Sequence, residues 1–430
     1  METFGFAVIA FAVLGFGLIS KRVQHTILTP PMVFVAFGLL VGHAGLGWVE
    51  VEVEQIHLLA ELTLALVLFT DASRIDLSLL RREHDLPVRL LGLGLPLTMI
   101  LGAILAAWMF EALTLWEAAV LAIILAPTDA ALGQAVVSNP KVPVRIRQAL
   151  NVESGLNDGI ALPVLLIFIS IASAREAPNG DPIGYWVQFT ALQVLLGPLV
   201  GAAVGTFGSR LMERAWQKGW VNDSFLRLSA LGLALLSFAA AETIGGNGFI
   251  SAFVAGIAMG NCARTICPSL YEFGEAEGQL LTLIIFIVFG AAMVPDALPH
   301  IDGPAILYGL LSLTVVRMLP AALSLLGKGL QPGTLVFLGW FGPRGIASIL
   351  YALLVLGEAG IAGQEQILAV VTVTVLISVF AHGVTAYPGS SWYASHAETM
   401  KDVDPDCAEG RPVSEMPLRH PHRPARTRKA

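Results

Sequence analysis

Residues 151–166 read NVESGLNDGIALPVLL, and residues 153–158 set four polar side chains inside one of the most apolar stretches of the chain. The four are two carboxylates, an amide and a hydroxyl, from Glu153, Asp158, Asn157 and Ser154. Such groups need hydrogen bonds or ions wherever water is excluded. The chemistry of this stretch therefore depends on whether a soluble core or a membrane surrounds it.

The composition places the chain in a membrane. Of its 430 residues, 55% are hydrophobic and only 13% are charged, and the mean hydropathy is +0.74. A soluble protein carries about twice that charged fraction. It also does not repeat apolar runs of about 20 residues, the length that crosses a hydrocarbon core of ~30 Å. We therefore expect an all-α polytopic membrane protein.

Thirteen apolar segments follow one another and predict about thirteen transmembrane helices. They cover residues 3–20, 28–46, 55–72, 86–109, 115–137, 146–173, 185–209, 224–242, 247–262, 278–296, 304–326, 333–356 and 365–388. The first carries its positive charges after the apolar run, so we expect a retained span rather than a cleaved signal peptide. We expect residues 1–388 to form one transmembrane domain and the polar residues 389–430 to form a short, disordered cytoplasmic tail.

Lysine and arginine alternate between successive junctions of these segments. They gather in the junctions after the odd-numbered segments, from Lys21 to Lys328, whereas Arg175 is the exception in the junctions after the even-numbered ones. An excess of positive charge marks cytoplasmic loops. The pattern predicts an external N-terminus and a cytoplasmic C-terminus in a cell (inner) membrane.

Polar residues at mid-membrane depth are costly and point to function, and they occur in three places. Thr128 and Asp129 lie in APTDAALG (126–133), the four residues quoted above lie in the next segment, and Arg344 lies in FGPRGIAS (341–348). Prolines and glycines flank Asp129 and Arg344, and a proline frees a backbone carbonyl one turn earlier. Broken helices whose ends hold ions are typical of secondary transporters. Ordinary proline kinks in tilted helices are the alternative.

The two interrupted segments also indicate an internal repeat. They are the fifth and the twelfth, seven apart, so they run in opposite directions across the bilayer. The thirteen segments divide into six, one linker and six, with an interruption at the fifth position of each half. We expect two inverted six-helix repeats with two broken, crossing helices and a site at the midplane between the halves.

The opening stretch places its four polar residues on one face of a helix. At about 100° per residue they fall within an arc of about 140°. This face can meet the broken fifth segment, and hard cations prefer the oxygen ligands that both would present. Burial and acidic neighbours also favour the protonated form of a carboxylate. A carboxylate here could therefore exchange a proton for a cation near neutral pH.

The sequence resembles the monovalent cation/proton antiporters of the sodium/proton exchanger family, in particular their NhaP-like branch. The resemblance is carried by APTDAALG, NVESGLNDGIALP, FGPRGIAS, GGNGFISAFVAGIAMGN (245–261) and FTDASRIDLSLLRRE (69–83). It extends from the first segment to the thirteenth and omits the tail. It implies proton exchange for Na⁺, with Li⁺ or K⁺ as alternatives, by a homodimer that is not an enzyme. It implies neither a cofactor nor a nucleic-acid partner.

The resemblance also assigns roles to the polar residues. Asp158 corresponds to the aspartate that alternately binds the cation and the proton. Asp129 and Thr128 correspond to ligands at the unwound helix, and Ser154 to a further direct ligand of the transported Na⁺. Glu153 is expected to act directly or through water.

Two more residues carry expectations from the family. Asn157 stands where electrogenic relatives have a second aspartate, which implies electroneutral, one-for-one exchange. Arg344 resembles the buried arginine of the second broken helix, which balances helix ends and acidic side chains. The large regulatory C-terminal domains of eukaryotic exchangers have no counterpart here, so we expect no regulation of that kind.

Other functional classes fit less well. Asn157–Asp158 lacks the second acid of a prenyltransferase N-D-x-x-D motif, and the chain has no H-E-x-x-H. A channel rarely needs two carboxylates and broken helices, whereas a sodium-coupled symporter could use the same ion site. We interpret Arg317 as packed against carbonyls or reaching toward the cytoplasm. We interpret His382 as a structural histidine rather than a pH sensor.

Overall fold

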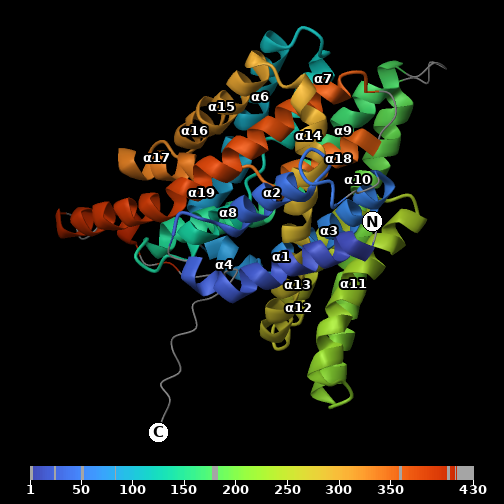
Figure 1. Cartoon of the computed structure of the whole chain (residues 1–430). Coiled ribbons are helices and arrows are strands. Elements are labelled where there is room, and N and C mark those ends of the chain that lie inside the picture. The colour runs from blue at the N-terminus through green and yellow to red at the C-terminus, as the bar shows by residue number, and fades with distance from the viewer. Residues whose placement is uncertain are drawn as a thin grey trace.

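The computed structural model describes residues 3–23, 26–49, 53–82, 84–176, 183–357, 361–403, 407–411 and 413. Every regular element within these ranges is a helix (Figure 1), which confirms the all-α prediction. The α-helices are α1 (Thr3–Val23), α2 (Pro30–Val41), α3 (Val53–Ser73), α4 (Leu77–Arg82), α5 (Asp85–Arg89), α6 (Leu95–Met109), α7 (Leu115–Ile124), α8 (Ala130–Val137), α9 (Val144–Glu176), α10 (Ile183–Gln217), α11 (Asp223–Thr243), α12 (Gly248–Cys262), α13 (Cys267–Val288), α14 (Val294–Ala297), α15 (Gly303–Leu313), α16 (Val315–Ser324), α17 (Pro332–Trp340), α18 (Ile346–Gly357) and α19 (Gln364–Val403). Two π-helical turns, η1 (Leu90–Gly94) and η2 (Phe289–Met293), and two 3₁₀ turns, η3 (Leu298–His300) and η4 (Ala408–Gly410), complete them.

The helices match the apolar segments in position. Within the described ranges nine helical stretches are long and apolar enough to cross a bilayer. Four shorter apolar helices, α2, α7, α12 and α18, lie in the remaining segments. Large side chains such as Phe11, Leu18 and Phe207 are more than 70% exposed, as expected where lipid rather than water covers the surface. The exact number of crossings and the inverted repeat stay predictions.

The helices pack in two groups. One contains α2, α3 and α10–α13, and the other contains α5–α9 and α15–α19. In the first group a side chain at Gly256 of α12 would overlap the carbonyl of Phe69 in α3. Small residues allow this close backbone approach between membrane helices. The second group contains both interrupted segments, and α9 contacts α3 and α10 of the first group.

Both interruptions lie where the prolines and glycines predict them. The fifth segment divides into α7, which ends at Ile124, and α8, which begins at Ala130. The twelfth divides into α17, which ends at Trp340, and α18, which begins at Ile346. Neither is an ordinary proline kink, because four or more residues leave the helix in each.

The last helix continues beyond the boundary that we expected at Pro388. The α19 helix, red in Figure 1, includes Pro388 and runs to Val403. Tyr393 explains part of this extension, because its ring is buried and stacks on Phe337 of α17 at 4.0 Å between centroids. The η4 turn, which follows α19 in sequence, is also packed against the protein, because Glu409 is only 2% exposed. Residues 404–406, 412 and 414–430 of the expected tail lie outside the described residues.

Candidate functional site

The two interrupted segments contact each other at their non-helical residues. The amide of Asp129 donates to the carbonyl of Pro343 over 2.8 Å. In the other direction the Arg344 guanidinium donates to the carbonyl of Pro127 over 3.2 Å. Each break thus supplies one donor and one acceptor to the other, and four helix ends meet at one point.

Asp129 serves two of these helix ends. Its Oδ1 accepts from the amides of Ala131 and Leu132 at the start of α8, over 2.6 and 3.1 Å. Its Oδ2 accepts from the amide of Ile346 at the start of α18, over 2.5 Å. A carboxylate is favourable at the positive N-terminal end of a helix, and here one carboxylate caps two. Any side chain at position 345 would overlap this carboxylate, so Gly345 is required.

Arg344 serves the other two ends. The side chain is fully buried, and its NH1 donates to the carbonyls of Pro127 and Gly342, over 3.2 and 3.1 Å. These carbonyls follow the C-terminal ends of α7 and α17, which carry partial negative charge. Balance of helix ends is what the resemblance implies for this residue. The hydrogen bonds that the Arg344 side chain donates to described residues both go to carbonyl oxygens, and none joins it to an acidic side chain.

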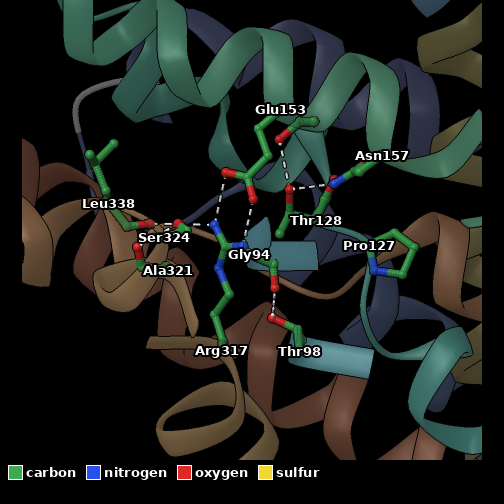
Figure 2. Close-up of polar contacts among 12 residues, drawn as sticks. Gly94, Thr98, Pro127, Thr128, Glu153, Asn157, Arg317, Ala321, Ser324 and Leu338 are labelled. Carbon is green, nitrogen blue, oxygen red and sulfur yellow. Dashed lines mark hydrogen bonds and ion pairs between the residues drawn. The ribbon is translucent and has the colours of Figure 1, made fainter. Parts of the chain in front are cut away.

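Hydroxyl and amide groups connect the first break to α9, as Figure 2 shows for Thr128 and Asn157. The Thr128 and Ser154 hydroxyl oxygens lie 3.1 Å apart. The Asn157 amide donates to the Thr128 hydroxyl over 2.7 Å and to the Thr128 carbonyl over 3.3 Å. All three side chains are at least 90% buried. The structure therefore brings together three of the residues that the sequence singled out.

Asp158 follows Asn157 on α9, and its side chain is 8% exposed. The backbone carbonyl of Asp158 accepts a hydrogen bond from the Tyr351 hydroxyl of α18 over 2.6 Å. This bond ties α9 to the second broken segment at the position of Asp158. The Asp158 carboxylate is thus carried by a part of α9 that contacts both broken segments, the first at Thr128 and the second through Tyr351 of α18.

Glu153 forms an ion pair that the sequence did not predict. Its two carboxylate oxygens accept from the two terminal nitrogens of Arg317 in α16, over 2.5 and 2.8 Å (Figure 2). Arg317 is 1% exposed, so our interpretation of it as reaching toward the cytoplasm was wrong. Arg317 also donates to the carbonyl of Leu338 over 3.5 Å, which agrees with the other interpretation, packing against carbonyls. The signal was available: a lone arginine inside an apolar segment needs an acidic partner.

An open pocket reaches Ser154. It is lined by α8, the early part of α9 and the second break, through Ala130, Gly133, Gln134, Val137, Leu150, Asn151, Ser154 and Phe341. The lining runs from Ser154 toward the end of α8, where the chain leads into the junction with Lys141. Within the described part of the chain no cluster of three His, Cys, Asp or Glu residues could hold a resident metal ion.

Several known proteins resemble the chain. The K⁺/H⁺ antiporter NhaP of Alkalimonas amylolytica is 25% identical over 393 residues, covering 90% of this chain and 66% of that protein. The Na⁺/H⁺ antiporter ApNhaP of Aphanothece halophytica is 26% identical, covering 82% and 68%. The chain thus spans just under two thirds of the length of the first of these relatives.

The fold also matches a solved structure. The sodium proton antiporter MjNhaP1 of Methanocaldococcus jannaschii at pH 8 superposes with a TM-score of 0.72 at 17% identity, covering 89% of this chain and all of that one. The transmembrane family of sodium/hydrogen exchangers matches residues 7–389, from α1 into α19. With broken helices that cross at Asp129 and Arg344 and a family match over most of its length, the chain belongs to the sodium/hydrogen exchanger family.

Proposed function

We propose that the protein is a secondary active antiporter that exchanges protons for a monovalent cation at the crossing of the two broken segments. The pocket carries this proposal, because it leads to Ser154, beside the hydroxyl and carbonyl of Thr128. Oxygen atoms of this kind are ligands for hard cations. Membrane transporters commonly bind ions where helices are interrupted.

Asp158 is the group that we assign to the exchange. The Asp129 carboxylate accepts hydrogen bonds from three backbone amides, and the Glu153 carboxylate accepts from the Arg317 guanidinium. These two acids therefore serve the scaffold in this proposal. Asp158 binds either a proton or the cation, and it cannot hold both. Competition for one carboxylate is sufficient for obligatory exchange.

The other residues complete the ligand set. The transported cation contacts Asp158, Ser154 and the hydroxyl or carbonyl oxygen of Thr128. Asn157 fixes Thr128 through its two donated hydrogen bonds and contributes no charge. Asp129 acts mainly by holding the ends of α8 and α18 in place beside these ligands.

The relatives support a monovalent cation without selecting one. The names of the two relatives above specify K⁺ in one case and Na⁺ in the other, and none specifies an organic co-substrate. We propose Na⁺ as the substrate, with K⁺ or Li⁺ as alternatives. The sodium-coupled symporter is not favoured.

Orientation and assembly follow the sequence expectations. We propose a cytoplasmic C-terminus, an external N-terminus and a homodimer in the cell membrane. The junction with Lys141 is then cytoplasmic, and the pocket that reaches Ser154 faces the cytoplasm. The bilayer is the only further partner in this proposal.

Exchange can be tested in proteoliposomes with a preformed ΔpH, reported by a fluorescent amine. Adding NaCl, KCl or LiCl should discharge the ΔpH, whereas choline chloride should not. Asp158→Asn should abolish the response to every salt, because the amide cannot exchange a proton. Asp296→Asn is the matched control, because that aspartate is 64% exposed and far from the breaks in sequence. Full exchange by a folded Asp158→Asn protein would overturn the assignment of Asp158, and no exchange by the wild type would overturn the function.

A further inference from the structure

Helix α19 places three polar side chains on one face, against the second break. Ser378, His382 and Thr385 are spaced by four and three residues, which puts them on neighbouring turns. His382 is 1% exposed, and Ser378 is fully buried. The residues that they contact are Trp340, the last residue of α17, and Arg344, which lies within the non-helical residues 341–345.

The His382 ring connects the end of α17 to the middle of the break. Its Nε2 lies 2.9 Å from the carbonyl of Trp340, the last residue of α17. Its Nδ1 lies 3.0 Å from the Ser378 hydroxyl oxygen. That same hydroxyl oxygen accepts from the backbone amide of Arg344 over 2.7 Å. One imidazole and one hydroxyl therefore bridge the carbonyl that ends α17 and the amide of Arg344.

The partners fix the proton positions in this bridge. Trp340 offers a carbonyl, so His382 must carry a proton on Nε2 to bond it. Arg344 donates to Ser378, which leaves the hydroxyl proton available for Nδ1. A proton on Nδ1 could instead reach the Ser378 carbonyl at 3.0 Å. Keeping the Trp340 bond would then require an imidazolium, and a second positive charge beside Arg344 is unfavourable. The neutral ring with its proton on Nε2 satisfies the bridge.

We infer that His382 is a positioning residue for ion exchange, acting through the second break. Its bridge fixes the main chain at Arg344, and thereby the guanidinium that bonds Pro127. It also fixes the start of α18, where Ile346 bonds Asp129. The inference deepens the proposed function and rests on it. His382 itself contacts neither the cation nor the proton that is exchanged.

Two substitutions separate this role from simple packing. The side-chain amide nitrogen of glutamine can take the place of Nε2 and donate to the carbonyl of Trp340. The asparagine side chain is shorter by one carbon, so its amide nitrogen takes the place of Nδ1 and does not reach Trp340. We expect His382→Gln to keep the initial exchange rate within about threefold of wild type, and His382→Asn to lower it at least tenfold. Ser378→Ala should resemble His382→Asn, because it releases the Arg344 amide. The double variant His382→Asn with Ser378→Ala should exchange no more slowly than the slower of the two single variants, because both residues act in one network.

Thr385→Val is the matched control. Thr385 accepts from the Trp340 ring nitrogen over 2.9 Å and lies on the same face of α19, but it bonds no backbone atom of the break. We expect its rate to stay near that of wild type. Rates are measured by ΔpH discharge in proteoliposomes over a series of NaCl concentrations, at equal protein content. Thermal unfolding in detergent shows which variants are folded.

The outcomes are distinct. A rate for folded His382→Asn equal to that of His382→Gln would overturn the inference, as would an unaffected Ser378→Ala. If His382→Asn does not fold, the comparison of Ser378→Ala with Thr385→Val decides instead: a selective loss in the former supports the bridge, and equal rates overturn it. Absence of exchange in the wild type would reject the proposed function itself and is recognised before any variant is compared.

Discussion

Glu153 and Arg317 form a two-point ion pair across 164 residues of sequence, with nitrogen–oxygen distances of 2.5 and 2.8 Å. Both side chains are at most 2% exposed. The pair joins α9, which carries the exchanging aspartate in our proposal, to α16, which precedes the second broken segment. It therefore connects the two halves of the chain at the depth of the site.

Breaking this pair should destabilise the protein strongly. Arg317→Ala leaves a buried carboxylate without its partner, which costs roughly 3–5 kcal/mol. Replacing both members with apolar residues, as in Glu153→Leu with Arg317→Met, should recover most of this loss. Thermal unfolding of the purified proteins in one detergent measures both effects. A melting temperature for Arg317→Ala equal to that of wild type would contradict the structural role of the pair.

Asp129 should show a graded response because it caps two helices. Asp129→Ala removes both caps, each worth roughly 1 kcal/mol. Asp129→Asn keeps an oxygen for α8 but places the amide NH₂, which can only donate, toward the backbone amide of Ile346 in α18. We expect the unfolding temperature to be highest for the wild type, lower for Asp129→Asn and lowest for Asp129→Ala. If the two variants were equally stable, the double capping would not hold.

Removing Arg344 should affect exchange and stability together. Arg344→Ala leaves the carbonyl ends of α7 and α17 facing each other without a positive charge. Arg344→Lys keeps the charge but loses the fork that reaches two carbonyls, so it should retain part of the rate. Arg264→Ala serves as the control, because that arginine is 55% exposed. Normal exchange and normal melting of Arg344→Ala would show that the crossing needs no charge there.

Transport should be independent of the membrane potential. If Asp158 is the only group that exchanges, one positive charge enters for each that leaves. The potential can be set with a thiocyanate gradient in the absence of K⁺, using Na⁺ as the substrate. Moving one net charge through about −100 mV supplies roughly 2.3 kcal/mol. A severalfold change in rate between zero and that potential would rule out electroneutral exchange.

The η4 turn, which follows the last long helix α19, should contribute to the stability of the protein. The Glu409 carboxylate accepts from the amide of Gln331 over 2.7 Å and from the Thr334 hydroxyl over 2.9 Å, at the start of α17. Glu409→Ala should lower stability by roughly 1 kcal/mol, the usual effect of losing a cap. Glu398→Ala, on the exposed face of α19, provides the comparison. Equal unfolding temperatures for the two variants would show that the cap is unimportant.

The sequence predicts the helices and the breaks because their causes are local. Apolar length identifies the spans, and Pro127 and Pro343 beside deep charges identify the interruptions. The partners of those charges are not local. Asp129 caps α18 only because the breaks cross, and no periodicity in either segment encodes that contact. The acidic partner of Arg317 is not predictable from its own segment for the same reason, since Glu153 lies in another helix.

The length of α19 was unpredictable for a related reason. Polar composition indicates disorder after Pro388, but Tyr393 and Glu409 are polar residues that find buried partners on α17. Their burial depends on a surface that only the folded bundle provides. Composition describes the average behaviour of a segment and cannot identify the two side chains that dock.

The position of Glu409 in the chain means that α17 is synthesised before the residue that caps it. A chain emerges from its N-terminus, and Glu409 follows its partner Gln331 by 78 residues. The start of α17 therefore enters the membrane without the carboxylate that finally caps it. The cap of the second broken segment is made 78 residues after Gln331, so a chain that ends before residue 407 would keep that helix end open.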